Sequence, residues 1–477
     1  PVDMVKFYGL IINKSRKIRH RSIEQLKQEL LYLFMGKASK NKRQQKSQAE
    51  SILNGKSFIS SDISSKWSLF NKPIIHFFVI VVVGLLVYSN TFNVPFLFDD
   101  RNNIIENYKL RDLNNFWPPT ESRWFGYLTF ALNYHFGGLN IIGYHVVNLI
   151  IHIFNAILVY LFVMLTFKTP FFSSQQSAVS NQKKQTLLHP FTYFPLFIAL
   201  LFVAHPIQTQ AVTYIVQRFT SLATMFYLLS LVMYIKARLE VKTKVKFFSA
   251  STLIFYFLSI ASAILAMKTK EIAFTLPVII VLYEFMFFGN NQFVIPVKTG
   301  IQDKNEMDSC FRRNDRMEGG YKRLLYLIPF LLTLLIIPLS LIGIDKPIGD
   351  AIGELRKAAQ ETEGIPRWSY LFTQFRVVVT YVRLLFLPIN QNLDYDYPLY
   401  HSFFNPEVFL SFLFLLLIFS FGIYLSYAKR YTLSATRLIS FSIFWFFITL
   451  SVESSIIPIR DVIFEHRLYL PVMGIII

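Results

Sequence analysis

Apolar runs of about 20 residues recur along the chain, separated by shorter polar stretches. A helix of about 20 residues crosses roughly 30 Å of hydrocarbon, so we expect each run to be a membrane span. The predicted spans are 74–89, 142–167, 191–204, 220–235, 247–267, 272–288, 324–344, 404–427 and 438–450, and a tenth begins at Pro471. The pattern predicts an all-α, polytopic membrane protein over residues 74–477.

One apolar segment, "YLFTQFRVVVTYVRLLFLP" from Tyr370, departs from this pattern. Arg376, Thr380 and Arg383 have spacings of four and three, which place them on one helical face. We interpret the segment as an interfacial or re-entrant amphipathic helix, because a further crossing would move the basic loop "AKRYTLSATR" outside. The alternative is a true span whose two arginines line a cavity.

Composition and charge support the membrane interpretation. The 477 residues are 53% hydrophobic, include 50 Phe and carry a net charge of +19. The Lys and Arg residues gather in the first 73 residues and in loops near 236, 312 and 428, which we therefore place in the cytoplasm. Membrane topology explains this charge, and no nucleic-acid partner is expected. The opposite face then collects residues 90–140, 205–218, 268–271, 345–400 and 453–467.

Several segments are expected to have no catalytic role. Residues 1–73 form a basic cytoplasmic segment without a secretory signal, and residues 289–322 form a cytoplasmic loop. The loop's "IPVKTGIQ" and "MDSCFRRND" resemble translated repetitive elements inserted in bacterial proteins. The single Cys310 excludes an internal disulfide and a cysteine-based metal cluster. The chain starts without Met and stops inside an apolar run, so we expect it to be a piece of a longer protein.

Two adjacent carboxylates follow the first span, in "PFLFDDRNNII". Burial and a neighbouring like charge raise the pKa of Asp99 or Asp100 towards the range of a general base, whereas Arg101 lowers it. The alternative is a solvated turn with a helix-capping Asp.

A second polar motif, "EHRLYLP", precedes the last apolar run on the same predicted face. Arg467 has the fork geometry that suits a phosphate, and Glu465 and His466 can orient it or share a proton. The alternative is a simple interfacial anchor.

Three further outer segments carry candidate residues. In "HPIQTQAVTYIVQR", His205 and Gln208 can contact a sugar and Arg218 lies near the end, although a plain connector fits as well. In "KTKE", two exported lysines beside Glu271 suit an anion at membrane depth, and a short turn is the alternative. In "INQNLDYDYP", Asp394 and Tyr395 suit sugar recognition, while Tyr is also the ordinary interface residue. The two exported lysines are Lys268 and Lys270.

Within the second predicted span, four polar side chains share one helical face: His145, Asn148, His152 and Asn155. Polar residues in hydrocarbon favour the interior of a bundle, so we predict helix-to-helix hydrogen bonds here rather than metal binding. Gly-rich phosphate loops, nucleophile elbows and Walker patterns do not occur, so ATP-driven transport and serine hydrolysis have no motif support.

Taken in order, "VPFLFDDRNNI", "HPIQTQAVTYIVQR", "KTKEIAFTLPVIIVLYE", "RVVVTYVRLLFLPINQNLDYDYP" and "FEHRLYLPVMG" carry a family resemblance. The chain resembles the membrane half of the transmembrane and tetratricopeptide repeat-containing, O-mannosyltransferase-like family within the C-type glycosyltransferase superfamily. The resemblance implies a helical bundle with interfacial helices in the outer loops and an active site on the non-cytoplasmic face. The family's repeat array would follow the last span.

The resemblance also implies a chemistry. A polyprenyl-phosphate-linked sugar is the donor, an acidic residue of the first outer loop (Asp99 or Asp100) is the base, and Arg467 represents the cations near the donor phosphate, with Lys268, Lys270, Arg218 and Arg101 as further candidates. The expected partners are membrane lipids and a protein or other envelope acceptor, and the expected location is a bacterial inner membrane. No cofactor is predicted, and divalent-metal assistance is left open. The alternatives are a transferase acting on a lipid or polysaccharide, a membrane scaffold, or a lipid-carrier transporter.

Overall fold

The computed structural model describes residues 72–173, 193–243, 249–289, 326–342, 365–427, 434–455, 457–459 and 461–477. The chain divides into two compact units, Pro1–Ile75 and His76–Ile477. Nearly all of the first unit, the predicted insertion from residue 290 onward and the basic loop at 428–433 lie outside the described residues. The expectations for these segments therefore stay predictions.

The described part of the chain is helical and contains no strand, which confirms the predicted all-α class. Its α-helices are α2 (Pro73–Val87), α3 (Trp124–Gly137), α4 (Ile141–Thr166), α6 (Phe194–Ala204), α7 (Thr209–Thr213), α8 (Arg218–Thr243), α9 (Ala250–Met267), α10 (Leu276–Tyr283), α12 (Ile336–Ile342), α14 (Arg367–Phe386), α15 (Pro406–Tyr427), α16 (Ser434–Leu450) and α17 (Met473–Ile476). Short 3-10 or π turns join them: η1 (Thr91–Asn93), η2 (Arg101–Ile105), η3 (Tyr108–Arg111), η4 (Leu113–Phe116), η5 (Pro206–Gln208), η6 (Ile215–Gln217), η7 (Glu271–Thr275), η8 (Glu284–Phe288) and η9 (Glu465–Leu468).

Five helical stretches are long and apolar enough to cross a membrane: Ile141–Thr166, Ile215–Val241, Ala250–Met267, Glu271–Phe288 and Pro406–Tyr427. Shorter apolar helices occupy Pro73–Val87, Tyr326–Ser340 and Ala435–Leu450. Each lies where an apolar run predicts a span. The chain is therefore an integral membrane protein with a polytopic helical fold, as predicted.

A sixth candidate span is broken. The helices Phe194–Ala204 and Pro206–Thr213 meet at an angle of 50°. His205 is extended at this junction, with ψ of 125°, because a residue that precedes proline is pushed out of the helical region, and Pro206 itself has no N–H to continue the ladder. The break turns α7 away from the direction of α6.

The interior of the bundle is built around α4, which packs against α6 and α8, and α8 in turn packs against α9. Side chains such as Val159, Phe202 and Leu231 are fully buried in this core. The four polar residues of α4 are also fully buried. Asn148 donates to the Val212 carbonyl, and Asn155 to the Ser221 carbonyl. These bonds between helices confirm the prediction for this face.

The amphipathic segment forms one helix, α14, which packs against α15, and α15 packs against α16. Helix α14 is not among the helices that are apolar enough to be candidate spans. This agrees with the interfacial interpretation. Arg376 faces α15, where it lies 3.4 Å from the Glu407 carboxylate and 3.5 Å from the Ser411 hydroxyl. α15 exposes much of its apolar surface, including Leu410 and Leu417.

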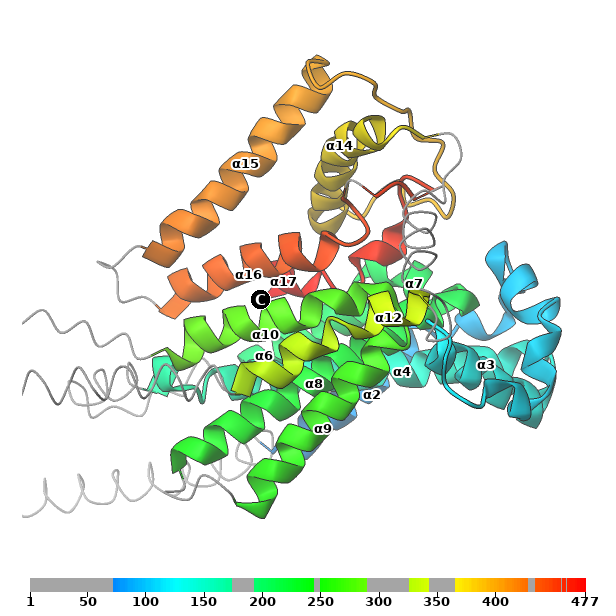
Figure 1. Ribbon diagram of the computed structural model, residues 1–477, viewed down its shortest axis with the longest axis horizontal. Coiled ribbons are helices and arrows are strands. Elements are labelled where there is room, and N and C mark those ends of the chain that lie inside the picture. The colour runs from blue at the N-terminus through cyan, green and yellow to red at the C-terminus, as the bar shows by residue number, and fades with distance from the viewer. Residues whose placement is uncertain are drawn as a thin grey trace, which may run out of the picture. The chain divides into compact units, whose positions relative to one another are not determined.

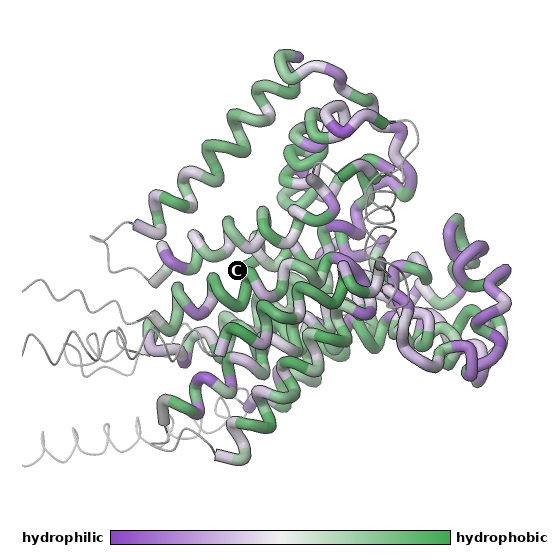
Figure 2. The backbone as a smooth tube through the Cα atoms, viewed as in Figure 1, coloured by the Kyte–Doolittle hydropathy of each residue, from purple (hydrophilic) through white to green (hydrophobic). Residues whose placement is uncertain are grey.

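In Figure 1 the short turns η1 to η4 and helix α3 lie at one end of the helical bundle, on the right of the view, and α7 lies towards the same end. Figure 2 shows that hydrophilic residues gather there, whereas the residues of the long helices are mostly hydrophobic. Asp99, Asp100 and Arg101 belong to the stretch from η1 to η4.

Candidate functional site

The two adjacent carboxylates behave differently. Asp100 is 1% exposed, and both of its oxygens accept backbone hydrogen bonds, from the N–H of Leu97 at 2.9 Å and from the N–H of Val216 at 2.6 Å. Burial raises its pKa to about 6 against the opposing effect of these bonds, and the charge of Asp99 adds to the rise. Asp100 thereby ties the loop that follows α2 to η6, the turn that leads into α8.

Asp99 is exposed, and its backbone N–H donates to the Tyr214 hydroxyl at 2.8 Å. Its carboxylate also interacts with that hydroxyl. The preceding residue, Phe98, has a φ of 41°, a left-handed conformation that non-glycine residues rarely adopt. This turn separates the two carboxylates, so that Asp99 is accessible while Asp100 is not.

The "EHRLYLP" motif forms η9, and its three polar side chains are buried. Arg467 donates to the carbonyls of Asp461 at 2.6 Å and Val462 at 2.9 Å. The Tyr370 hydroxyl, which donates to the Glu453 carbonyl, also contacts Arg467. The guanidinium is therefore fixed in one orientation.

His466 lies among positive charges. Its pKa is well below the ordinary value because it is buried, and because Lys270, Arg467 and Arg123 lie nearby. The Oε1 atom of Gln210 accepts from the His466 backbone N–H at 2.6 Å and lies 3.1 Å from Nδ1. The imidazole is thus neutral. We call Arg123, Lys270 and Arg467 the cation cluster.

Two carboxylates balance part of this charge. Lys270 lies 2.7 Å from Oε1 of Glu453 and donates to the Thr220 hydroxyl at 2.9 Å. Arg123 makes a bidentate pair with Glu271 at 3.0 and 2.9 Å, and this pairing raises the pKa of Arg123. Arg467 has its own contacts to backbone carbonyls instead, so the cluster keeps a net positive charge.

Glu465 binds the loop at residues 387–400. Its carboxylate accepts from the side chain of Gln391 at 2.7 Å, from the Asn392 N–H at 2.8 Å and from the Tyr395 hydroxyl. The carboxylate also raises the pKa of Tyr395, second to burial. Glu465 and Tyr395, predicted separately from distant motifs, therefore meet and hold the 387–400 loop against η9.

Other predicted residues lie elsewhere. Arg218 is fully buried and donates to Asn148, Asn133, Thr129 and Tyr144. Its guanidinium also covers the Phe130 ring at 4.4 Å. Because all three of its nitrogens have acceptors from α3 and α4, Arg218 has the contacts of a brace between helices.

Four further candidates are exposed, partly buried or located at the break between α6 and α7. Arg101 pairs with Glu106 at 2.6 Å and is exposed, as is Asp394. Lys268 is partly buried, and its ammonium lies 3.4 Å from the Thr120 carbonyl. His205 donates to the Leu385 carbonyl and accepts from the Ile207 N–H, which occupies both ring nitrogens.

Gln208 is fully buried, and neither its amide oxygen nor its nitrogen has a hydrogen-bond partner in the described part of the chain. It belongs to η5, which packs against η9. Its predicted contact with a sugar stays a prediction.

The sequence interpretation missed Arg123, Glu453 and Gln374. Glu453 lies shortly after the predicted span 438–450, and Asp99 lies in the polar segment after the first predicted span, so a similar positional signal applies to both. Arg123 and Gln374 become recognisable only from their contacts with Glu271 and with the carbonyl of Val462.

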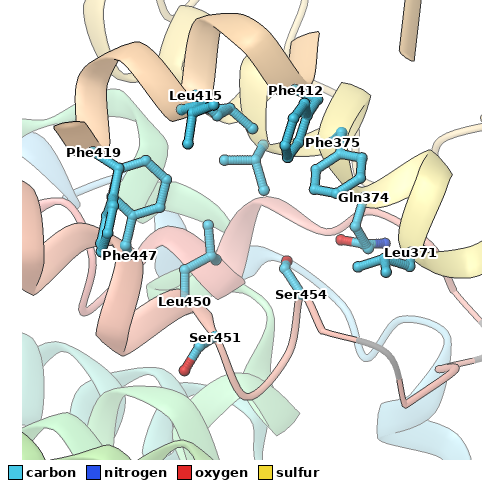
Figure 3. Close-up of a pocket in the computed structure, with 12 residues that line it drawn as sticks. Leu371, Gln374, Phe375, Phe412, Leu415, Phe419, Phe447, Leu450, Ser451 and Ser454 are labelled. Atoms are coloured by element: carbon cyan, nitrogen blue, oxygen red, sulfur yellow. The ribbon is translucent and has the colours of Figure 1, made fainter. Parts of the chain in front are cut away.

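An apolar groove of about 280 Å³ lies between α14, α15 and α16. Figure 3 shows aromatic and aliphatic side chains on its walls, with Gln374 beside Leu371 on one side, Ser451 beside Leu450 on the other, and Ser454 between them. Gln374 donates to the Val462 carbonyl at 3.0 Å, the same oxygen that accepts from Arg467. The side of the groove that Gln374 lines therefore adjoins the cation cluster.

Helix α7 connects the two groups of candidates. Gln210 accepts from the backbone N–H of His466, and the hydroxyl of Tyr214, the residue that follows α7, accepts from the backbone N–H of Asp99. Among the described residues no group of three His, Cys, Asp or Glu side chains is arranged to hold a metal ion.

These features define a class, an integral membrane protein of many helices with a buried cationic site beside an apolar groove. No family model and no solved structure matches the chain. Curated relatives do. The chain is 28% identical over 254 residues to "Protein O-mannosyl-transferase TMTC4" of Mus musculus. This match covers 50% of this chain and 33% of that protein. It is 34% identical over 170 residues to "Protein O-mannosyl-transferase tmtc2" of Xenopus laevis, covering 32% and 18%.

A longer match, 27% identical over 327 residues, joins the chain to "Protein O-mannosyl-transferase Tmtc3" of Drosophila melanogaster and covers 63% of this chain and 35% of that protein. The matches therefore span about a third or less of the length of these relatives. They confirm the resemblance to the O-mannosyltransferase-like family that the motifs indicate.

Proposed function

We propose that this chain is the membrane part of a glycosyltransferase that moves a sugar, mannose by analogy with the names of its relatives, from a polyprenyl-phosphate donor to a hydroxyl of a protein on the non-cytoplasmic face. One observation carries the proposal: the apolar groove adjoins the cation cluster through the shared carbonyl of Val462. A lipid phosphate is the kind of ligand that combines an apolar chain with an anion at membrane depth.

Within this proposal, Arg467 and Lys270 bind the donor phosphate and stabilise its charge as it leaves. Both are held by neighbouring groups before any ligand arrives, which suits electrostatic stabilisation of developing charge. His466, neutral in this environment, offers Nε2 as an acceptor for a sugar hydroxyl. Glu465 and Tyr395 fix the loop that covers η9.

Asp99 is the proposed proton acceptor. Its carboxylate is accessible, whereas both oxygens of Asp100 are bound by backbone N–H groups. In the reaction, the acceptor oxygen forms a bond to the anomeric carbon, the phosphate leaves with the electron pair of the broken C–O bond, and the hydroxyl proton passes to Asp99. Asp100 positions this loop against α8.

The test uses the full-length protein in proteoliposomes with radiolabelled polyprenyl-phosphate mannose and cell-envelope proteins as acceptors. We expect protein-bound label with the wild type and a loss of at least about 100-fold with Asp99→Asn, in the range of general-base contributions. Glu106→Gln removes another exposed carboxylate of the same loop and should leave transfer unchanged. Label in a lipid or polysaccharide fraction alone would contradict the protein acceptor, and full transfer by Asp99→Asn would remove the proposed base.

A further inference from the structure

Glu453 has a special place in the cation cluster. It lies just after α16, is 8% exposed, and its Oε1 atom is 2.7 Å from Lys270 Nζ. Its charge also acts on Arg467 and Arg123. The charge of Glu453 therefore acts on all three members of the cation cluster, which includes Lys270 and Arg467, the two residues that we propose for the donor phosphate.

The second oxygen of Glu453 is unsatisfied. Oε2 is buried and has no hydrogen-bond partner in the described ranges, and the same holds for the Ser454 hydroxyl and the Gln374 amide oxygen. Buried polar atoms without partners cost free energy, and native proteins keep few of them. The Glu453 carboxylate is therefore held by Lys270 through one oxygen alone, and its other oxygen and the Gln374 amide oxygen can only accept hydrogen bonds, such as those that the hydroxyls of a sugar donate. Gln374 and Ser454 also line the groove in Figure 3.

We propose that Glu453 is an exchangeable counter-ion: it holds Lys270 while the site is empty, and the phosphate of the donor displaces it from Lys270. This inference rests on the proposed function. Two anions cannot share the contact with Lys270 without repulsion, so binding of the phosphate and release of the Glu453 carboxylate are coupled. Glu453 therefore acts against ligand binding, in contrast to Lys270 and Arg467.

The exchange has a use in turnover. The donor is a phosphodiester with one negative charge, whereas the leaving polyprenyl phosphate is a monoester with a charge of about −1.5 to −2 near pH 7. The cation cluster alone would therefore hold the product more tightly than the donor. Return of Glu453 to Lys270 replaces the contact that the product loses, which favours its release.

The decisive measurement is binding of polyprenyl phosphate to the full-length protein in nanodiscs, compared between the wild type, Glu453→Gln and Glu453→Asp. Glu453→Gln keeps the shape and removes the charge, so we expect the Kd to fall about tenfold, while kcat falls because product release slows. Glu453→Asp keeps the competing charge and should bind within about threefold of the wild type. Glu407→Gln, a glutamate at the start of α15 that pairs with Arg376, is the matched control and should not change the Kd.

The outcomes separate the two proposals. If the wild type binds polyprenyl phosphate and Glu453→Gln binds it equally or more weakly, Glu453 is a fixed ion-pair partner and the exchange is wrong. If the wild type does not bind this lipid at all, the proposed function itself fails. Inorganic phosphate as a second ligand tests the source of the anion: tighter binding of both ligands by Glu453→Gln supports the exchange, and a preference for the lipid in the wild type assigns the groove to its tail.

A folding control keeps the test decisive. Thermal unfolding of each variant is followed without ligand, and Glu453→Ala is measured beside Glu453→Gln. If Glu453→Gln does not fold, the same gain in affinity is expected of Glu453→Ala, and its absence there overturns the exchange.

Discussion

Gln374 and Arg467 donate to one and the same oxygen, the carbonyl of Val462, at 3.0 and 2.9 Å. Gln374 lines the apolar groove between α14, α15 and α16, and Arg467 belongs to the cation cluster. The shared acceptor fixes how the two parts of the proposed site meet. The following predictions test the residues on either side of this contact.

Replacement of Asp100 and of Asp99 should have different effects. Asp100→Asn places an NH2 group where one of the two backbone N–H donors now binds, so we expect a loss of stability of about 1–3 kcal/mol together with reduced transfer. Asp99→Asn should lower transfer without a comparable loss of stability, because Asp99 is exposed. Thermal unfolding and transfer measured on the same preparations check both, and equal destabilisation by the two changes would contradict the assignment.

The stability of the protein should depend on pH through Asp100. Burial raises its pKa to about 6 in the folded protein, above the unfolded value, so protonation favours the folded state. This contribution is complete below about pH 4 and is lost as the pH rises through 6, with an upper limit of about 3 kcal/mol. Unfolding midpoints between pH 4 and 7 should fall more steeply for the wild type than for Asp100→Asn, and parallel curves would show that Asp100 does not titrate there.

Arg467→Lys should lower transfer at least about tenfold although the charge is kept. Lysine cannot reach the carbonyls of Asp461 and Val462 with a fork, and an Arg-to-Lys change at such a site is not conservative. Steady-state kinetics with the lipid donor measure the loss. The control is Arg383→Lys, an exposed arginine of α14, which we expect to match the wild type.

Tyr469→Phe should destabilise the fold by about 1–3 kcal/mol. The Tyr469 hydroxyl is buried between His152 Nδ1 at 2.7 Å and the Asn155 amide at 3.0 Å, so its removal leaves two polar groups of α4 without this partner. The midpoint of thermal unfolding in detergent gives the effect. Tyr427→Phe, at an exposed position of α15, supplies the comparison and should change little.

Gly474→Ala should cost about 1–3 kcal/mol, the range for overpacking. A Cβ at this position would lie 2.5 Å from the Ser442 carbonyl oxygen and 3.1 Å from the Phe446 nitrogen, both in the backbone of α16. Gly137→Ala, in α3, meets no atom within 4 Å and should be neutral or slightly stabilising. If the unfolding midpoints of the two variants shift by the same amount, the close approach of α17 to α16 is disproved.

The helices could be predicted from the sequence because they depend on local information. Apolar runs of sufficient length, broken by residues such as Pro206, determine where each helix forms, and the polar face of α4 indicates which side is buried. The amphipathic character of α14 could also be predicted, because the spacing of its arginines places them on one helical face.

The site could be predicted only in part. Arg467 stands out in a polar motif before the last apolar run, Lys270 stands out as a lysine on the face where the charge rule predicts few, and both join the cation cluster. The pairing of Arg123 with Glu271, across 148 positions of the chain, depends on tertiary contact and leaves no local signal. The contrast between Asp99 and Asp100 depends on the turn at Phe98, which adjacent identical residues cannot reveal.

Helix α7 has a consequence for how this protein can vary. Its five residues fix the separation between the segment that offers Asp99 and the segment that offers His466. One residue inserted between Gln210 and Tyr214 would turn one anchor by about 100° relative to the other. A change of length within this single helical turn would therefore misplace Asp99 relative to His466, so the turn sets the spacing of both halves of the proposed chemistry.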